Sequence, residues 1–162
     1  MPVVSNTSPL SNLAIIDRLE ILRGQIGPIA IPPAVQFELD RLSHSPARAR
    51  LAAALRDGWV RVVPLTAAMP QTLAATLDPG EAEALALAAQ VQASLILLDE
   101  TAARLKATQL GIRHTGVLGV LRRAKQAGQI PSLAAEIRKL RADAHFFINP
   151  ALEKRLLAAS GE

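Results

Sequence analysis

The run Leu95–Leu98 consists of four apolar residues, ends at an aspartate and precedes a helix-forming segment. Its length suits a strand, and the absence of polar residues indicates that both of its faces are covered. Similar short apolar segments occur at Val3–Val4, Ile29–Ile31 and 59–63. Because such segments alternate with helical patterns along the chain, they favour a parallel sheet with helices on both faces.

We therefore expect a three-layer α/β/α domain with a mostly parallel central sheet of four or five short strands, the last near 112–114. Ser8 and Pro9 are the expected N-cap and first residue of the first helix, which Gly24 ends. The other helices are expected to begin near Pro33, Ser45, Glu81, Glu100, Gly116, Pro131 and Pro150. The chain has 162 residues and no linker-like tract, which favours a single domain over residues 1–162.

Composition excludes several classes of protein. Cysteine is absent, which rules out zinc fingers, disulfide frameworks and thiol catalysis. No apolar run approaches the ~20 residues that cross a bilayer, and the first residues lack a basic leader, so we expect a cytoplasmic protein with no membrane partner. One tryptophan and three phenylalanines are the only aromatic residues, which argues against nucleic-acid modules built on stacking platforms.

Charge is distributed unevenly. Residues 1–99 carry 7 basic and 9 acidic side chains, whereas residues 100–162 carry 11 and 5. One interpretation is an ordinary set of solvated helix faces. The other is a basic flank beside an acidic centre, which suits a metal-dependent enzyme that acts on a polyanion.

Two polar positions follow predicted strands. Asn6–Ser8 comes after the first strand and Asp99 comes after Leu95–Leu98. In open parallel sheets the functional site lies beyond the carboxyl ends of the strands. The chain contains no phosphate-binding glycine loop, no dinucleotide fingerprint and no nucleophile elbow, and its three histidines are isolated. These absences leave hard oxygen ligands, and hence Mg²⁺ or Mn²⁺, as the metal chemistry to consider.

Four carboxylates lie near strand ends or helix starts, and each has an alternative structural role. Glu38 borders an apolar helix face, where it can be a plain exposed charge. Glu81 lies in a first helical turn, where the macrodipole favours an acid anyway. Glu83 fits a solvent position. Asp99 can be an N-cap, a role for which Glu100 and Thr101 also compete.

Taken in order, these segments resemble the PIN-domain nucleases. The chain is similar to a PIN-like branch described as predicted nucleic-acid-binding proteins, related to the VapC-type toxin ribonucleases. The matching segments are Val4–Leu10, Ile31–Val35 with Glu38–Leu39, Asp78–Ala84, Leu97–Glu100 with Arg104, and Thr115–Leu121. They keep their order and spacing over roughly the whole chain.

The resemblance implies an α/β/α domain that holds Mg²⁺ or Mn²⁺ with a cluster of acids and cleaves RNA. It places Asn6, Glu38, Glu81 and Asp99 at the catalytic positions, and the last three as metal ligands. Glu83 replaces Glu81 if the register slips by two residues. Asn6 stands where most PIN domains have their first aspartate, so this chain offers a neutral oxygen in place of a full charge. We therefore expect weak metal binding without RNA, slow turnover or loss of catalysis.

Several substrate contacts are also expected. Thr7 and Ser8 fall on the hydroxyl positions beside the first acid and can orient water or phosphate. Arg104 can pair with a phosphate or with one of the acids. Residues 115–116 can bind a phosphate at a helix start, or simply cap that helix. The expected contacts with the RNA backbone are Arg113, Arg122, Arg123 and Lys125.

The resemblance further implies a toxin held inactive by a small antitoxin protein. The C-terminal helices, about residues 131–160, can form a homodimer or partner face through Phe146–Ile148, Leu152 and Leu156–Leu157, or can fold back onto the core. Two other classes of function remain open. One is a non-catalytic PIN-fold module that binds RNA or a partner. The other is a receiver-like or flavodoxin-like domain, for which Asn6–Thr7 is a poor match and the lysine after the last strand is missing.

Overall fold

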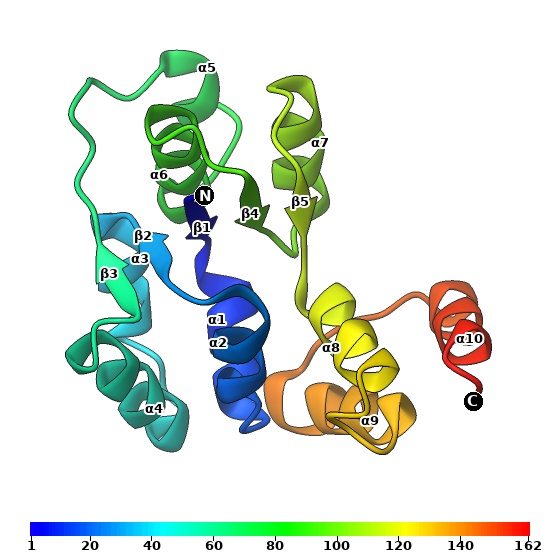
Figure 1. Ribbon diagram of the computed structural model, residues 1–162. Coiled ribbons are helices and arrows are strands. Elements are labelled where there is room, and N and C mark those ends of the chain that lie inside the picture. Colours follow the sequence, from blue (N-terminus) through cyan, green and yellow to red (C-terminus); the bar gives the residue numbers. More distant parts are fainter.

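A computed structural model describes all of residues 1–162. Five short strands form one sheet with the order β3-β2-β1-β4-β5 (Figure 1). The strands are β1 (Val3–Ser5), β2 (Ile29–Ile31), β3 (Val60–Val62), β4 (Leu95–Leu97) and β5 (His114–Thr115). Every pair is parallel, so the expected α/β class is confirmed and the sheet is parallel throughout.

Ten helices surround the sheet. They are α1 (Thr7–Ile15), α2 (Leu19–Ile26), α3 (Pro33–Leu39), α4 (Ser45–Arg56), α5 (Gln71–Ala74), α6 (Pro79–Gln90), α7 (Thr101–Gln109), α8 (Val117–Gln126), α9 (Leu133–Ala144) and α10 (Pro150–Ala159). Figure 1 shows α5, α6 and α7 in the upper half of the view, with α4, α8 and α9 below.

The two faces of the sheet bury two separate cores. Val3 and Leu97 pack into the larger core, with α1, α4, α8 and α9. Val4 and Ile96 point into the smaller core, with α6 and α7. Successive residues of a strand face opposite sides, so the central strands β1 and β4 supply both cores and are apolar except for Ser5. This is the physical basis of the apolar runs in the sequence.

The sequence-based prediction of the first helix is wrong at both ends. The helix begins at Thr7, and the residue before it, Asn6, has an extended backbone whose N–H donates to the Leu97 carbonyl oxygen at 3.0 Å. The helix therefore starts directly where the β1–β4 ladder ends. The chain then breaks at Asp17, which has a φ of 60° and permits the N–H of Arg18 to bond the Leu13 carbonyl oxygen.

Other boundaries also differ from the prediction. Gly24 lies inside α2, which continues to Ile26 and ends at Gly27, whose φ of 81° leaves the helical region. The fifth strand lies at 114–115 instead of 112–114. The helix expected at Glu81 begins two residues earlier, with Asp78 as its N-cap. The one-turn helix α5 has no counterpart in the sequence prediction.

The C-terminal helices fold back onto the domain. Leu152, Leu156 and Leu157 of α10 are half-buried against the larger core. The side chain of Glu162 accepts hydrogen bonds from the backbone N–H groups of Leu133 and Ala134, at 2.6 and 3.2 Å, and so caps the start of α9. Of the two arrangements expected for the C-terminal helices, these leucines therefore show the one in which the helices fold back onto the core.

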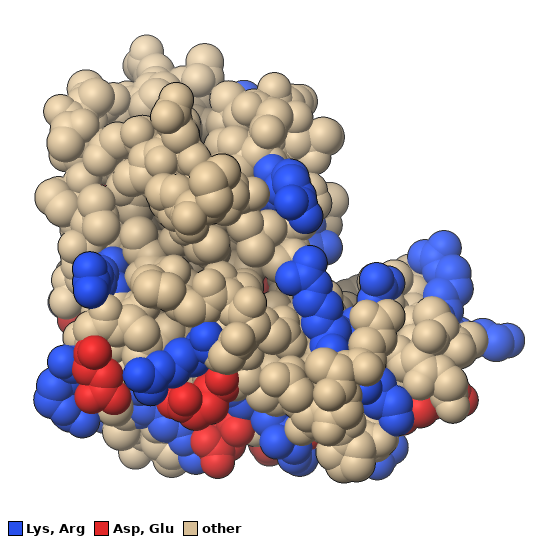
Figure 2. Space-filling model, viewed as in Figure 1, with Lys and Arg blue, Asp and Glu red and all other residues tan.

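Charge is concentrated away from one end of the molecule. Figure 2 shows Lys and Arg side chains over the lower half of the view and along α8 to α10, while the end around α5 and α6 carries almost none. None of the helices combines the length and the apolar character that crossing a bilayer requires.

An ion pair connects the α1–α2 turn to α9. Glu136 is 2% exposed, and its Oε1 accepts hydrogen bonds from Nε and Nη2 of Arg18 at 3.0 and 2.6 Å. Lys139 lies 3.4 Å from the same oxygen, while Oε2 of Glu136 is buried without a partner. A carboxylate buried to this extent depends on its cation.

We expect Arg18→Met to lower the free energy of unfolding by about 3 kcal/mol, because it leaves the Glu136 charge buried with only Lys139 beside it. The double variant Arg18→Met/Glu136→Leu should recover most of this loss, because it removes the charge as well. Urea unfolding of the three proteins measures both effects. Equal stability of Arg18→Met and wild type would contradict the role of this pair.

Candidate active site

The polar residues predicted from the sequence come together at the carboxyl ends of β1, β2 and β4. Asn6 follows β1 directly, Glu38 lies on the helix after β2, and Asp99 follows β4. β1 lies between β2 and β4, so the segments that follow these three strands emerge side by side. Helix α6 packs against α3 and contributes Glu81 from its first turn.

Asn6 is the deepest of these residues. It is 3% exposed, and its side-chain Oδ1 is buried and accepts no hydrogen bond. A buried amide oxygen without a partner costs free energy comparable to a lost hydrogen bond. A cation is one partner that would satisfy it.

Asp99 is held from three sides. Its Oδ1 accepts from the backbone N–H of Val117 at 2.9 Å, and its Oδ2 accepts from Nδ2 of Asn12 at 3.2 Å. Nη2 of Arg104 lies 3.7 Å from Oδ1, and Nε of Arg104 donates to the Leu98 carbonyl oxygen at 2.9 Å. Burial raises the pKa of Asp99, and these three partners oppose that shift. The pairing of Arg104 with an acid, one of its two expected roles, is thus present.

Glu38 is oriented by two neighbours. The hydroxyl of Thr7 donates to its Oε2 at 2.8 Å. Its Oε1 approaches the backbone of Gly80 so closely that a Cβ at that position would fall on it. Burial raises the pKa of Glu38, the Thr7 hydrogen bond lowers it, and the charges of Asp78 and Glu83 raise it further.

Glu81 is buried in the first turn of α6. The backbone N–H of Glu81 donates to Oδ1 of Asp78, the N-cap, at 2.8 Å. Burial, with the charges of Asp78 and Glu100 acting in the same direction, raises the pKa of Glu81 to about 7. An acid that is half protonated near neutral pH marks a site in which negative charge is poorly neutralised.

Glu83, the expected substitute for Glu81, makes a structural contact. Its Oε2 accepts a hydrogen bond from the backbone N–H of Ala34 at 2.7 Å. Ala34 is the second residue of α3, so Glu83 caps the helix that carries Glu38. This contact ties α6 to α3 and sets the position of Glu38 relative to Gly80.

The candidate acids share an electrostatic environment without forming one compact cluster. Asp78 raises the pKa of both Glu38 and Glu81, and Glu100 raises the pKa of both Glu81 and Asp99. No three His, Cys, Asp or Glu side chains are grouped closely enough to hold a metal ion. The donor atoms that the region offers are hard oxygens, including the unpartnered Oδ1 of Asn6, and oxygens of this kind are the ligands of Mg²⁺ and Mn²⁺. The raised pKa values of the acids are also what a site for a divalent cation would show in its absence.

The other expected contacts divide into two groups. Arg113, Arg122 and Arg123 are exposed, whereas Nζ of Lys125 donates to the Pro131 carbonyl oxygen at 2.8 Å and pairs with Glu162. Ser8 lines a cavity of about 400 Å³ beside Asp99. Gly116 is the N-cap of α8, where a Cβ would meet Arg104, Asp99 and the Leu98 carbonyl oxygen.

Two residues of this region, Asn12 and Asp78, were missed by the sequence analysis, whereas Glu100 was among its candidates for an N-cap. Asn12 bonds Asp99, and its i, i+4 spacing from Ser8 on α1 was the available signal. Asp78 starts a capping-box pattern with Glu81, three residues later. Glu100 is the N-cap of α7, and its carboxylate makes no hydrogen bond.

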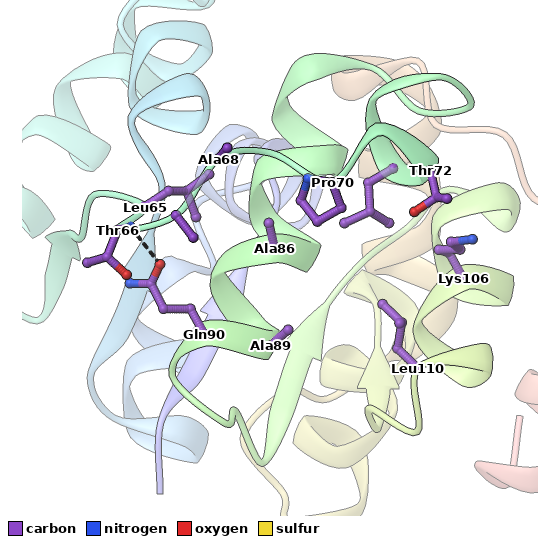
Figure 3. A pocket seen from close by; sticks show the side chains of 12 residues that line it. Leu65, Thr66, Ala68, Pro70, Thr72, Ala86, Ala89, Gln90, Lys106 and Leu110 are labelled. Carbon is purple, nitrogen blue, oxygen red and sulfur yellow. Dashed lines mark hydrogen bonds between the residues drawn. The ribbon is translucent and has the colours of Figure 1, made fainter.

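A separate apolar cavity of about 360 Å³ lies between α6, α7 and residues 65–73 (Figure 3). The side chain of Gln90 accepts a hydrogen bond from the backbone N–H of Thr66 at 2.8 Å and holds this segment against α6. Leu65, Ala86 and Leu110 line the cavity, and Lys106 is its one charged residue. It contains none of the candidate acids, so it is a feature distinct from the strand-end site.

A family model described as a PIN domain matches residues 2–162. The chain belongs to the PIN domain family. The match spans the whole sheet and all of the candidate acids, and the three-layer fold agrees with it. Comparison with curated proteins gives no match.

Membership indicates a nuclease-type function and nucleic-acid binding, and PIN domains generally depend on divalent metal ions. In this PIN domain Asn6 and Asp99 directly follow strands, and the catalytic and metal-binding roles of the strand-end residues stay predictions. Asn6 occupies the most buried of these positions, where it has no charge to contribute.

The raised pKa of Glu81 predicts how stability depends on pH in EDTA. The folded protein holds its proton up to about pH 7, whereas an ordinary glutamate with a pKa of 4.5 releases it earlier. The folded state therefore binds more protons than the unfolded state in this window, and the stability should fall as the pH rises from about 5 to 7.

We expect Glu81→Gln to flatten this slope, and the exposed Glu20→Gln to retain it. Thermal unfolding of the three proteins across the window gives the comparison. An unchanged slope in Glu81→Gln would show that another group causes the pH dependence.

Proposed function

We propose that this PIN domain is a divalent-metal-dependent endoribonuclease. The observation that carries the proposal is the buried, unpartnered Oδ1 of Asn6 at a strand end surrounded by acids whose pKa values are raised. Family membership supports the class of reaction, and the donor atoms support Mg²⁺ or Mn²⁺.

Glu38, Glu81 and Asp99 are the proposed ligands, with the Asn6 amide oxygen as a neutral donor. Because no three acids are grouped in this structure, these side chains would have to move closer together around an ion. When bound, a divalent ion supplies positive charge at the scissile phosphate and lowers the pKa of a nearby water molecule. The chain itself sets the donor positions. Thr7 orients Glu38 through its hydroxyl, and Asn12 orients Asp99 through its amide.

Arg104 and Ser8 are the proposed phosphate contacts. Arg104 is anchored on the Leu98 carbonyl oxygen, so its guanidinium is fixed beside the strand end before substrate arrives. A guanidinium held in place loses little conformational entropy when it binds a phosphate oxygen. Ser8 makes no side-chain hydrogen bond within the chain, which leaves its hydroxyl available to a water molecule or a phosphate. The exposed Arg113, Arg122 and Arg123 supply positive charge for the RNA backbone.

The resemblance to VapC-type toxins extends the proposal to a cytoplasmic toxin with a small antitoxin protein. The same resemblance extends the proposal to a homodimer, in which residues 1–162 of each chain form one domain and residues about 131–160 form the interface. Co-purification with proteins encoded beside it tests for the antitoxin complex, and light scattering tests for the homodimer.

A second candidate function is a PIN-fold module that binds RNA or a partner without cleaving RNA. Two observations favour it. Asp99 already has three partners inside the chain, and no three acids are grouped for a metal ion. Metal-dependent cleavage separates the two functions.

We expect the purified protein to cleave RNA from a mixed pool in Mg²⁺ or Mn²⁺ and to be inactive in EDTA. Glu81→Gln and Glu38→Gln should each lower the rate roughly 100-fold or more, because charge stabilisation by a metal supplies several kcal/mol. Asn6→Asp should lower the metal concentration needed for half-maximal cleavage, because it adds a charged ligand. The exposed Glu20→Gln is the matched control.

Activity that persists in EDTA and in both acid variants would exclude the metal mechanism. RNA binding without cleavage in any metal would favour the binding module. Neither binding nor cleavage would contradict both functions.

The contact between Gly80 and Glu38 provides a separate test. Gly80→Ala places a methyl group on the Glu38 carboxylate, so the carboxylate must move away. Alanine is also the better helix former, so the stability should stay near that of wild type. We expect cleavage to fall by roughly 10-fold or more, in the range of lost supporting contacts at metal sites.

Gly24→Ala is the matched control. It also lies inside a helix, but its added methyl group would have open space around it. It should stabilise the protein slightly and leave the cleavage rate unchanged. Full activity in Gly80→Ala would show that the position of Glu38 does not matter.

A further inference from the structure

Two of the four aromatic side chains are strongly exposed. Phe147 is 83% exposed and Phe37 is 57% exposed, whereas Trp59 is buried and Phe146 packs against the larger core. An exposed ring leaves apolar area in water that folding does not remove. Both rings are therefore available to a ligand.

Each exposed ring lies beside candidate acids. Phe37 lines a cavity of about 600 Å³ together with Glu38, Asp78 and Glu83. Phe147 lines the cavity of about 400 Å³ that contains Asp99. The cavities draw on different elements: the first on α3 and α6, and the second on α1, α7 and the segment before α10.

The two cavities meet at the start of α1. Thr7 donates its hydroxyl to Glu38, which lines the first cavity, and the next residue, Ser8, lines the second. The backbone of Thr7 and Ser8 directly follows Asn6. The two rings therefore line two different cavities, each of which contains a candidate acid.

The surroundings of the rings suit a nucleic-acid strand. The guanidinium of Arg41 lies over the Phe37 ring, 3.3 Å from its centroid, and adds positive charge at that side. Arg104 pairs with Asp99, which lines the cavity that contains Phe147. The other large exposed apolar residues are not placed in this way: Leu105 and Leu110 line cavities without a candidate acid.

We propose that Phe37 and Phe147 are base-stacking residues that hold unpaired bases of single-stranded RNA in two cavities beside the strand-end acids. This inference rests on the proposed nuclease function and names its substrate class. Aromatic rings stack on the face of any base, so they favour single strands with little sequence preference. In a duplex the base faces are already stacked on one another and cannot reach the rings.

The position of the rings revises the expectation, drawn from the small number of aromatic residues, that this protein does not bind nucleic acid by stacking. Four aromatic residues are too few for a stacking platform that covers a sheet. Two rings are enough when each is placed beside the acids. The small number of aromatic residues therefore does not exclude stacking in this chain.

The first test measures binding of a fluorescein-labelled single-stranded RNA of about 12 nucleotides, in Ca²⁺, under conditions where a gel shows no cleavage. Phe147→Ala and Phe37→Ala should each weaken binding by roughly 10-fold, the range for loss of one stacked base. Phe147→Tyr and Phe37→Tyr should restore it. Leu105→Ala is the matched control, because it removes an equally exposed apolar side chain away from the acids.

The second test uses RNAs with an abasic site at each position in turn. At one position, removal of the base should weaken binding to wild type about as much as Phe147→Ala weakens binding of intact RNA. Binding of that abasic RNA to Phe147→Ala should then show no further loss of affinity. A second position should behave in this way with Phe37→Ala. Alanine variants that bind like wild type, or additive losses at every position, would overturn the proposal.

Duplex RNA and the kinetics of cleavage distinguish this inference from the function on which it rests. The alanine variants should raise KM for single strands while kcat changes little, and should leave duplex binding unchanged. Equal losses on duplex and single strands would overturn stacking. If Glu81→Gln abolishes cleavage while the rings prove irrelevant, the nuclease function stands without this inference. Failure of wild type to bind or cleave single-stranded RNA would remove both.

Discussion

The carboxylate of Asp99 joins segments that come from distant parts of the chain. It follows β4, bonds the first turn of α8 through the N–H of Val117, holds α1 through Asn12 and pairs with Arg104 of α7. Desolvation opposes its charge and raises its pKa, and these partners offset part of that cost. The close approach of Gly116 to the same carboxylate leaves no room for a side chain there. The helices around the strand end are therefore arranged about one buried anion.

The acids of this region serve the fold and the candidate site together. Asp78 caps α6, Glu83 caps α3, and Asp99 caps α8. Caps gather at the carboxyl ends of parallel strands because the helix that follows each strand starts there. Burial, together with the negative charge that this placement concentrates, raises the pKa of Glu81 to about 7. A neutral Asn6 at the deepest position avoids a further buried charge, at the expense of one charged donor to a cation.

Much of the fold was predictable, and the reasons are local. Strands buried on both faces must be apolar, so Leu95–Leu98 was recognisable from four residues. The glycine and proline signals around α4, α7 and α8 placed those helices correctly. The start of α1 and its break at Asp17 were not predictable in this way. They depend on a hydrogen bond from Asn6 to Leu97, which lies 91 positions further along the chain, and on a left-handed residue with no glycine to mark it.

The sequence by itself determined the parallel α/β class and the polar residues at the strand ends, because both follow from short-range patterns of apolar and polar side chains. Only the tertiary structure decided what each polar residue contacts. It assigns Glu83 to the cap of α3, gives Asp99 a partner in Asn12, and leaves Oδ1 of Asn6 without one. It also places Phe37 in a cavity with Glu38 and Phe147 in a cavity with Asp99. Such contacts join residues far apart in the chain, and their geometry is set by how helices pack on the sheet, which no local pattern records.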